Sequence, residues 1–244
     1  MIRILRLLPS LFLLLTACQS GPDARRIIAD AIDAHGGTRY QNVRIEFDFR
    51  QFHLNLEHRD GRFRYERTHR DSAGTVIQEI LTNDDFARSL NGQRQTLDSA
   101  ARSKWSNAVN AMAYFALLPA KLADPAVQPE YLGETTIDGQ TYDKIRVTFS
   151  QEGGGKDYED VFFYWFNRRT HTMDFLSYSE GGARFRKAIN PQTVGGIRMQ
   201  DYINYTTMPG DTSTNVGDFD RKYAAGQLRE LSRIEQKAVR VTSL

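Results

Sequence analysis

The first regular pattern along the chain is helical. Apolar residues Ile28 and Ile32 lie on one stripe, and Asp23 is placed to cap the first turn. Gly36-Gly37 ends this segment, because glycine readily adopts the conformation that follows a helix C-terminus. A second helical spacing runs over residues 98–118 and stops before a proline. The pattern therefore predicts two helices, one before and one inside the main body of the chain.

Between and after these helices, apolar residues alternate with polar ones, as in half-exposed strands. The alternation that starts at Val43 changes parity at Phe52, which we interpret as a bulge or sharp bend in one extended run. Asp60-Gly61 and Asp138-Gly139 are typical two-residue hairpin turns. Residues 161–166 are apolar on both parities, which predicts a strand covered on both faces.

The C-terminal part continues this pattern less clearly. We expect a turn over residues 190–196, a mobile loop over 206–226 and a closing helix over 227–237. Roughly ten short strands in one meander, with the two helices, predict an α+β domain built on a bent antiparallel sheet.

The N-terminus has a separate pattern. Two arginines precede a short apolar run, which ends in Leu15-Thr16-Ala17-Cys18. This organisation describes a secretory signal peptide that is too short to span a bilayer permanently. The residues around Cys18 are similar to the bacterial lipobox, which implies that the thiol receives a diacylglycerol. We therefore expect a lipoprotein signal peptide at 1–17, a lipidated tether at 18–22 and a single domain at 23–244.

The net charge of the chain becomes balanced once the signal peptide is removed. The full chain has a net charge of +2, and two of its 32 basic residues lie in the signal, so the mature chain balances basic and acidic residues. A neutral body does not favour electrostatic binding of nucleic acid. The expected partner is instead a membrane, reached through Cys18. In the bacterial sorting rule that this signal resembles, Asp directly after the cysteine favours retention in the inner membrane. Gln19 stands at that position, so we expect the outer membrane, with the protein facing the periplasm.

The layout resembles the open half-barrel of the lipoprotein-sorting carriers of the LolA and LolB type, and of related mycobacterial lipoproteins. That resemblance implies helices in the concave side of a bent sheet and an apolar cavity between them. A narrower set of motifs resembles an uncharacterised family of bacterial outer-membrane lipoproteins; these are Ala34-His-Gly-Gly37, Tyr114-Phe-Ala-Leu-Leu-Pro119, residues 152–160, Tyr164-Trp-Phe-Asn167 and Gly195-Gly-Ile-Arg198. Neither resemblance implies a catalytic activity.

The sequence contains no recognisable catalytic residues, metal ligands or cofactor motif. The five histidines lack zinc-binding spacing, and no nucleophile-elbow motif occurs. We interpret His35 as a residue that caps the first helix in its charged form. The acidic residues Asp157, Glu159 and Asp160 suit calcium by type, although solvated loop residues are the simpler interpretation. Arginines at 184, 186 and 198 could meet an anionic head group or simply face water.

Aromatic residues are the remaining clue, with 14 Phe, 11 Tyr and 2 Trp. Core packing explains most of them, but a half-barrel has an open side across which the inserted helix would lie. Met and aromatic side chains form adaptable apolar pockets. The residues expected to line a ligand cavity are Phe47, Phe49, Trp105, Met112, Phe115, Phe163 and Trp165.

The sequence thus favours a non-enzymatic, lipid-anchored envelope protein that binds a lipid or acyl chain. Two alternatives stay open. In one, the same residues close a solid core and the protein is an interaction module that uses loops 150–160 and 206–226. In the other, weaker one, it is a periplasmic hydrolase with an unrecognised carboxylate pair.

Overall fold

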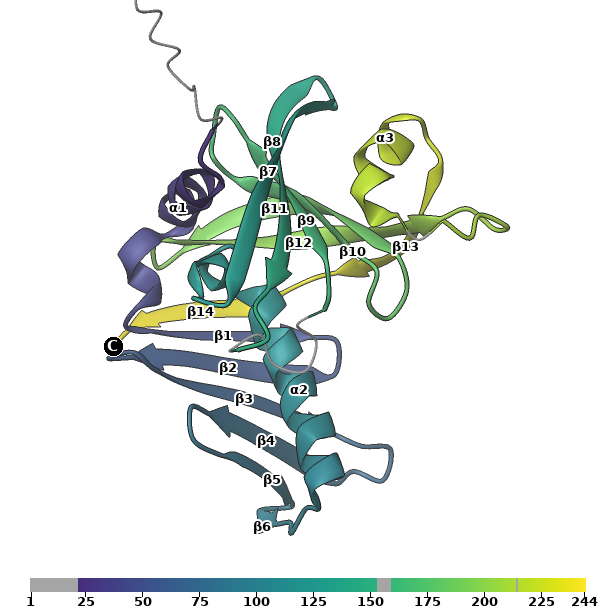
Figure 1. Ribbon diagram of the computed structural model, residues 1–244. Helices are drawn as coiled ribbons and strands as arrows, with labels where there is room; N and C mark the ends of the chain where they lie inside the picture. The colour runs from purple at the N-terminus through teal and green to yellow at the C-terminus, as the bar shows by residue number, and fades with distance from the viewer. Residues whose placement is uncertain (1–21, 153–158, 214) are drawn as a thin grey trace, which may run out of the picture.

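The computed structural model describes residues 22–152, 159–213 and 215–244. The predicted signal peptide, Cys18 and Asp157 lie outside these ranges. Within the described residues, the strands form two antiparallel sheets of seven strands each, accompanied by three α-helices. Every one of these elements lies within residues 23–244. The fold is therefore α+β, as predicted, and its arrangement is an open half-barrel (Figure 1).

The first sheet, here called sheet A, has the order β14-β1-β2-β3-β4-β5-β6. Asp60 and Gly61 form the turn between β2 and β3 with φ of 51° and 75°, a conformation that favours Asp-Gly in two-residue hairpins. The strands are β1 (Val43–Phe49), β2 (Phe52–Arg59), β3 (Arg62–Arg70), β4 (Val76–Thr82), β5 (Phe86–Leu90), β6 (Gln93–Arg94) and β14 (Lys237–Ser243).

The second sheet, sheet B, has the order β13-β12-β11-β10-β9-β8-β7. Its strands are β7 (Val127–Ile137), β8 (Gln140–Phe149), β9 (Phe162–Asn167), β10 (Met173–Tyr178), β11 (Arg184–Val194), β12 (Ile197–Thr207) and β13 (Leu228–Ile234). The turn predicted over residues 190–196 is shorter than expected, because β11 continues to Val194 and only Gly195-Gly196 connects it to β12.

The helices are α1 (Ala24–His35), α2 (Ser99–Ala116) and α3 (Phe219–Ala224), with short 3-10 turns at Gly37–Tyr40, Ala120–Ala123 and Val216–Asp218. Both predicted helices begin at the predicted caps. Asp23 accepts a hydrogen bond from Arg25 N–H at 2.9 Å, and Asp98 accepts one from Ala101 N–H at 2.7 Å. None of the helices in the described part of the chain has the length and hydropathy needed to cross a membrane.

The parity change at Phe52 has a different cause from the one predicted. β1 and β2 are separate strands joined by a turn at Arg50-Gln51, where Arg50 has φ of 54°. In this hairpin Phe47 pairs with Leu54 and Phe49 pairs with Phe52, so the apolar residues of both strands share one face. A two-residue turn therefore replaces the predicted bulge.

The C-terminal segment also differs from the prediction. Residues 228–234 form strand β13 instead of a helix, and residues 216–224 contain a 3-10 turn and α3 instead of a continuous loop. Strand β13 has a bulge against β12: Glu230 pairs with Tyr205 and Ser232 pairs with Asn204. The bulge leaves Leu231 between the paired residues, which shifts the parity of the strand.

Sheet B is covered on both faces. Phe162, Tyr164 and Phe166 of β9 belong to a core that contains α1, whereas Phe163 and Trp165 pack on the opposite face with α3. Helix α2 packs against sheet A through Val109, Ala113 and Leu117. Figure 1 shows α2 lying across the strands of sheet A, with α1 and α3 beside different parts of sheet B. The two predicted helices therefore line the concave side.

Candidate ligand-binding cavity

A cavity of about 170 Å³ lies where α2 meets the two sheets. Helix α2 is held over sheet A by its buried apolar stripe, which leaves an adjacent stripe to face the space between the sheets. The lining is mainly apolar and comes from β1, β2, α2, β11, β12 and the end of β13: Phe47, Phe49, Leu54, Ala111, Met112, Phe115, Ala116, Arg186, Tyr202, Ile234 and Gln236.

Four residues that the sequence predicted as lining residues meet at this cavity. Phe47 and Phe49 enter from β1, and Met112 and Phe115 enter from α2. Met112 also contacts Arg67, whose guanidinium lies 3.7 Å from its sulfur. The alternation of β1 and the helical spacing of α2, together with the resemblance to a half-barrel, led to these four side chains.

Trp105 lies on the same helix but is not part of the cavity lining. Its ring stacks under the guanidinium of Arg88, whose Cζ atom is 4.0 Å from the ring centroid. Arg88 and Arg67 both pair with Glu79, which is fully buried in sheet A. Trp105 therefore covers a buried ionic cluster at one end of α2, a role that the sequence did not indicate.

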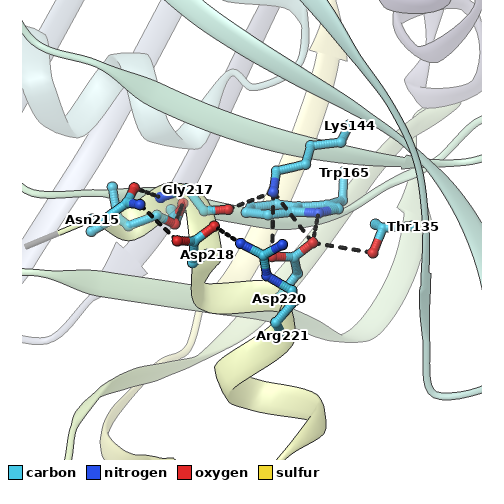
Figure 2. Close-up of polar contacts among 10 residues, drawn as sticks. Thr135, Lys144, Trp165, Asn215, Gly217, Asp218, Asp220 and Arg221 are labelled. Atoms are coloured by element: carbon cyan, nitrogen blue, oxygen red, sulfur yellow. Dashed lines mark hydrogen bonds and ion pairs between the residues drawn. The ribbon is translucent and has the colours of Figure 1, made fainter. Parts of the chain in front are cut away.

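Phe163 and Trp165 face away from the cavity and pack with α3. The prediction that they line it together with residues of β1 and α2 is therefore wrong. Figure 2 shows Trp165 beside Lys144 and Asp220 on the outer face of sheet B. Trp165 Nε1 donates to Asp220 at 3.3 Å, and Lys144 Nζ lies 3.3 Å from the same carboxylate. Thr135 donates to it as well, at 3.1 Å. These contacts attach α3 to sheet B.

The polar groups at the cavity are Arg186, Tyr202 and Gln236. Arg186 donates to the Tyr178 hydroxyl, and its Cζ lies 4.3 Å from the centroid of Phe115. Its Nε atom is buried without a hydrogen-bond partner among the described residues. Burial lowers the pKa of this guanidinium, while the tyrosine hydroxyls around it act in the opposite direction.

Tyr202 and Gln236 differ in whether their side-chain oxygens have hydrogen-bond partners. The Tyr202 hydroxyl accepts a hydrogen bond from Gln200 Nε2 at 2.9 Å. Gln236 Oε1 is buried and has no partner among the described residues. Neither residue was expected at the site. Gln236 lies in the segment predicted as a helix, and Tyr202 lies on a strand whose position relative to α2 depends on contacts far apart in the sequence.

His58 lies in a hydrogen-bond chain between two tyrosines. Tyr65 O–H donates to His58 Nε2 at 2.7 Å, and His58 Nδ1 donates to the Tyr40 carbonyl at 2.8 Å. Burial raises the pKa of Tyr65 and lowers that of His58, which suits a neutral hydrogen-bond chain. The described residues contain no cluster of three His, Cys, Asp or Glu side chains arranged to hold a metal ion.

His35 differs from its predicted state. Its Nε2 accepts a hydrogen bond from Met173 N–H at 3.1 Å, so the imidazole is neutral and contacts sheet B. Burial, with a smaller effect of the Arg198 charge, lowers its pKa from 6.5 to about 3. The predicted charged cap of α1 is therefore replaced by a buried neutral side chain that joins α1 to β10.

Comparison with solved structures shows the class of fold. A LolA superfamily protein from Nitrosomonas europaea is 12% identical, with 91% of this chain and 94% of that chain covered and a TM-score of 0.51. A candidate outer membrane lipoprotein-sorting domain from Vibrio parahaemolyticus is 9% identical over 75% and 86%, with a TM-score of 0.42. The lipoprotein LppX from Mycobacterium tuberculosis is 12% identical over 64% and 89%, with a TM-score of 0.29.

The first of these similarities confirms the predicted half-barrel fold, because it covers nearly the whole of both chains. No curated protein matches the chain in sequence. A family model does match, over residues 3–236, and its description is a family of unknown function. The match extends over most of the sequence, so the chain belongs to this family, DUF6503.

Proposed function

We propose that the protein binds a lipid or acyl chain in the cavity beside α2 and has no catalytic role. The observation that carries this proposal is the mainly apolar lining contributed by both sheets and α2. Burial of apolar ligand surface at such a site contributes roughly 25 cal/mol per Å² before the costs of association. The similarity in fold to a LolA superfamily protein supports the same function.

The size of the cavity limits how much ligand it holds in this conformation. A volume of about 170 Å³ is close to that of a cavity that accommodates benzene, on the order of 150 Å³. It therefore holds one short apolar segment. A longer acyl chain requires Met112 and Phe115 to move, and methionine is suited to this because its unbranched side chain adapts to different shapes.

The location that we propose is the bacterial envelope, with attachment to the outer membrane through lipidated Cys18. The sequence Leu15-Thr16-Ala17-Cys18 supports lipidation, and Gln19 supports the outer membrane. Two or more acyl chains provide stable attachment, whereas one does not. A protein held in this way would take its ligand from a nearby membrane surface.

The test is native mass spectrometry of residues 19–244, which contain every described element, purified without detergent from a bacterial periplasm. We expect an added mass that organic solvent releases and that is identified as lipid. The variant Ala116→Leu places three more carbons in the cavity lining, so bound ligand should decrease more than tenfold, from roughly 0.8 kcal/mol for each displaced methylene.

The matched control is Ala100→Leu, an exposed position on the same helix that does not line the cavity, and it should retain the ligand. A wild-type protein that stays free of ligand after incubation with an envelope lipid extract would contradict the proposal. That result would favour the interaction module with a solid core.

A further inference from the structure

The exceptional group at the cavity is the guanidinium of Arg186. Several other cations with little side-chain exposure have carboxylate partners: Arg67 and Arg88 share Glu79, Lys144 pairs with Asp220, and Lys121 pairs with Asp124. Arg186 instead contacts the Phe115 ring and the hydroxyl of Tyr178, and no described carboxylate forms an ion pair with it. A cation removed from water without a counter-charge is costly, so its place at a cavity requires an explanation.

The hydrogen bonds of Arg186 are also incomplete. A guanidinium has five N–H donors, and its Nε–H is buried here without an acceptor in the described chain. The surrounding groups are aromatic and therefore provide no negative charge; Phe115 and Tyr178 stack at 4.3 and 4.9 Å from Cζ to ring centroid. The guanidinium is thus held in position by ring stacking, with a donor still available.

Gln236 provides a second unsatisfied atom at the same cavity. Its Oε1 is buried and lacks a donor in the described residues, while its backbone N–H is fixed by Asp201 at 2.9 Å. Two of the residues that line this apolar space, Arg186 and Gln236, therefore each have one unsatisfied polar atom. Buried polar atoms in proteins are generally satisfied, and a ligand oxyanion would accept a hydrogen bond from the Arg186 guanidinium.

We propose that Arg186 binds the anionic group of an amphiphilic ligand, a carboxylate or a phosphate ester, whose apolar chain enters the cavity beside α2. This inference rests on the proposed function and specifies its ligand class. Charge-assisted hydrogen bonds from a guanidinium to an oxyanion are stronger than neutral ones, and removal from water strengthens them further. The ligand carboxylate or phosphate would supply the counter-charge that the described residues do not.

The experiment is isothermal titration calorimetry of residues 19–244 with decanoate, decyl phosphate, decanol and inorganic phosphate. Decanoate and decanol have the same chain length and differ in charge. We expect both anionic amphiphiles to bind at least tenfold more tightly than decanol, and inorganic phosphate to bind too weakly to detect. Tight binding of inorganic phosphate, without a gain from the decyl chain, would identify a free-anion site and overturn the proposal.

The variant Arg186→Met removes the charge and retains an unbranched side chain. It should bind decanol as the wild type does and lose the preference for decanoate, whereas Arg186→Lys should recover part of it. Arg184→Met is the matched control: Arg184 lies on the same strand, donates to the carbonyls of Ala183 and Gly181, and does not line the cavity. It should keep the wild-type preference.

The outcomes separate the two proposals. If wild type binds decanol and decanoate equally, or if folded Arg186→Met keeps the preference, the anion site is wrong while the apolar cavity stands. If neither amphiphile binds to wild type, both proposals fail. Circular dichroism of each variant establishes folding, and if Arg186→Met is unfolded, Arg186→Gln replaces it with the same expected loss of preference.

Discussion

At the scale of single residues, this protein keeps buried ionisable groups in three different states. Glu79 is paired with two arginines, Arg186 is stacked between aromatic rings, and His35 is neutral. The last state follows from the environment of His35, which has one hydrogen-bond donor, from Met173, and a nearby positive charge at Arg198. A proton added to this imidazole would have no acceptor group to stabilise it.

The His35 environment predicts a specific dependence of stability on pH. Its pKa is about 3 in the folded state and about 6.5 when unfolded. Above pH 6.5 both states are neutral and the group has no effect. As the pH falls from 6.5 towards 3, only the unfolded state takes up the proton, so the folded state loses stability.

We therefore expect the free energy of unfolding of wild type to fall by about 2 kcal/mol more than that of His35→Gln between pH 7.5 and 5. Glutamine is uncharged and has an oxygen that can accept the Met173 N–H. Urea denaturation of both proteins at several pH values measures the difference. Parallel profiles would show that His35 titrates normally in the folded protein.

At the scale of elements, α3 shows how a short helix is fixed to a sheet. Six residues are too few to form a stable helix alone. Phe219 is fully buried on the outer face of sheet B, and Asp220 beside it accepts from Lys144, Trp165 and Thr135 (Figure 2). Tertiary contacts, and not helix propensity, therefore hold this segment.

The variant Asp220→Ala should reduce the free energy of unfolding by about 3–5 kcal/mol, because it leaves the Lys144 charge buried without a counter-charge, with only the Gly217 carbonyl as acceptor. Arg221→Ala provides the control on the same helix. Arg221 pairs with Asp218 but is 73% exposed, so its loss should cost less than about 1 kcal/mol. Urea denaturation of both variants measures the two values, and equal losses would mean that the Lys144–Asp220 pair contributes little.

At the scale of the whole molecule, the C-terminal strands connect the two sheets. β13 ends sheet B beside β12, and the following strand β14 pairs with β1 in sheet A. The β11–β12 turn contacts β14 closely: a Cβ placed on Gly195 would lie 2.9 Å from Val241 Cβ. The cavity forms next to this connection, so its walls come from segments that are distant in sequence.

The proposed lipid anchor predicts where the complete protein is found. Cys18→Ser should prevent acylation, because the serine hydroxyl does not replace the thiol that carries the lipid. We expect wild type in the outer-membrane fraction of a bacterial host and the variant outside it. Ser20→Ala is a control that leaves Cys18 intact. Fractionation with mass spectrometry of the N-terminal peptide measures both, and an unmodified wild-type cysteine would contradict the anchor.

The sequence by itself determined the features that depend on neighbouring residues. The caps at Asp23 and Asp98, the Asp-Gly turns and the alternation in β1 involve groups only a few residues apart, so their types and spacing predict the local structure. The same local patterns, with the resemblance to a half-barrel, selected Phe47, Phe49, Met112 and Phe115, which the fold brings to one cavity. The helix predicted over residues 227–237 was wrong, because residues 228–234 pair with the distant strand β12 across a bulge.

Only the tertiary structure decided the rest. Val43 pairs with Ser243, 200 residues away, and no local pattern specifies that partner. Residues 162–166 are apolar on both parities, so their sequence could not show that Phe163 and Trp165 face α3 and not the cavity. Arg186 reads as an ordinary strand arginine until Phe115 of α2 packs against it. The physical reason is the same in each case: these positions are set by burial against distant segments, and that burial exists only in the assembled fold.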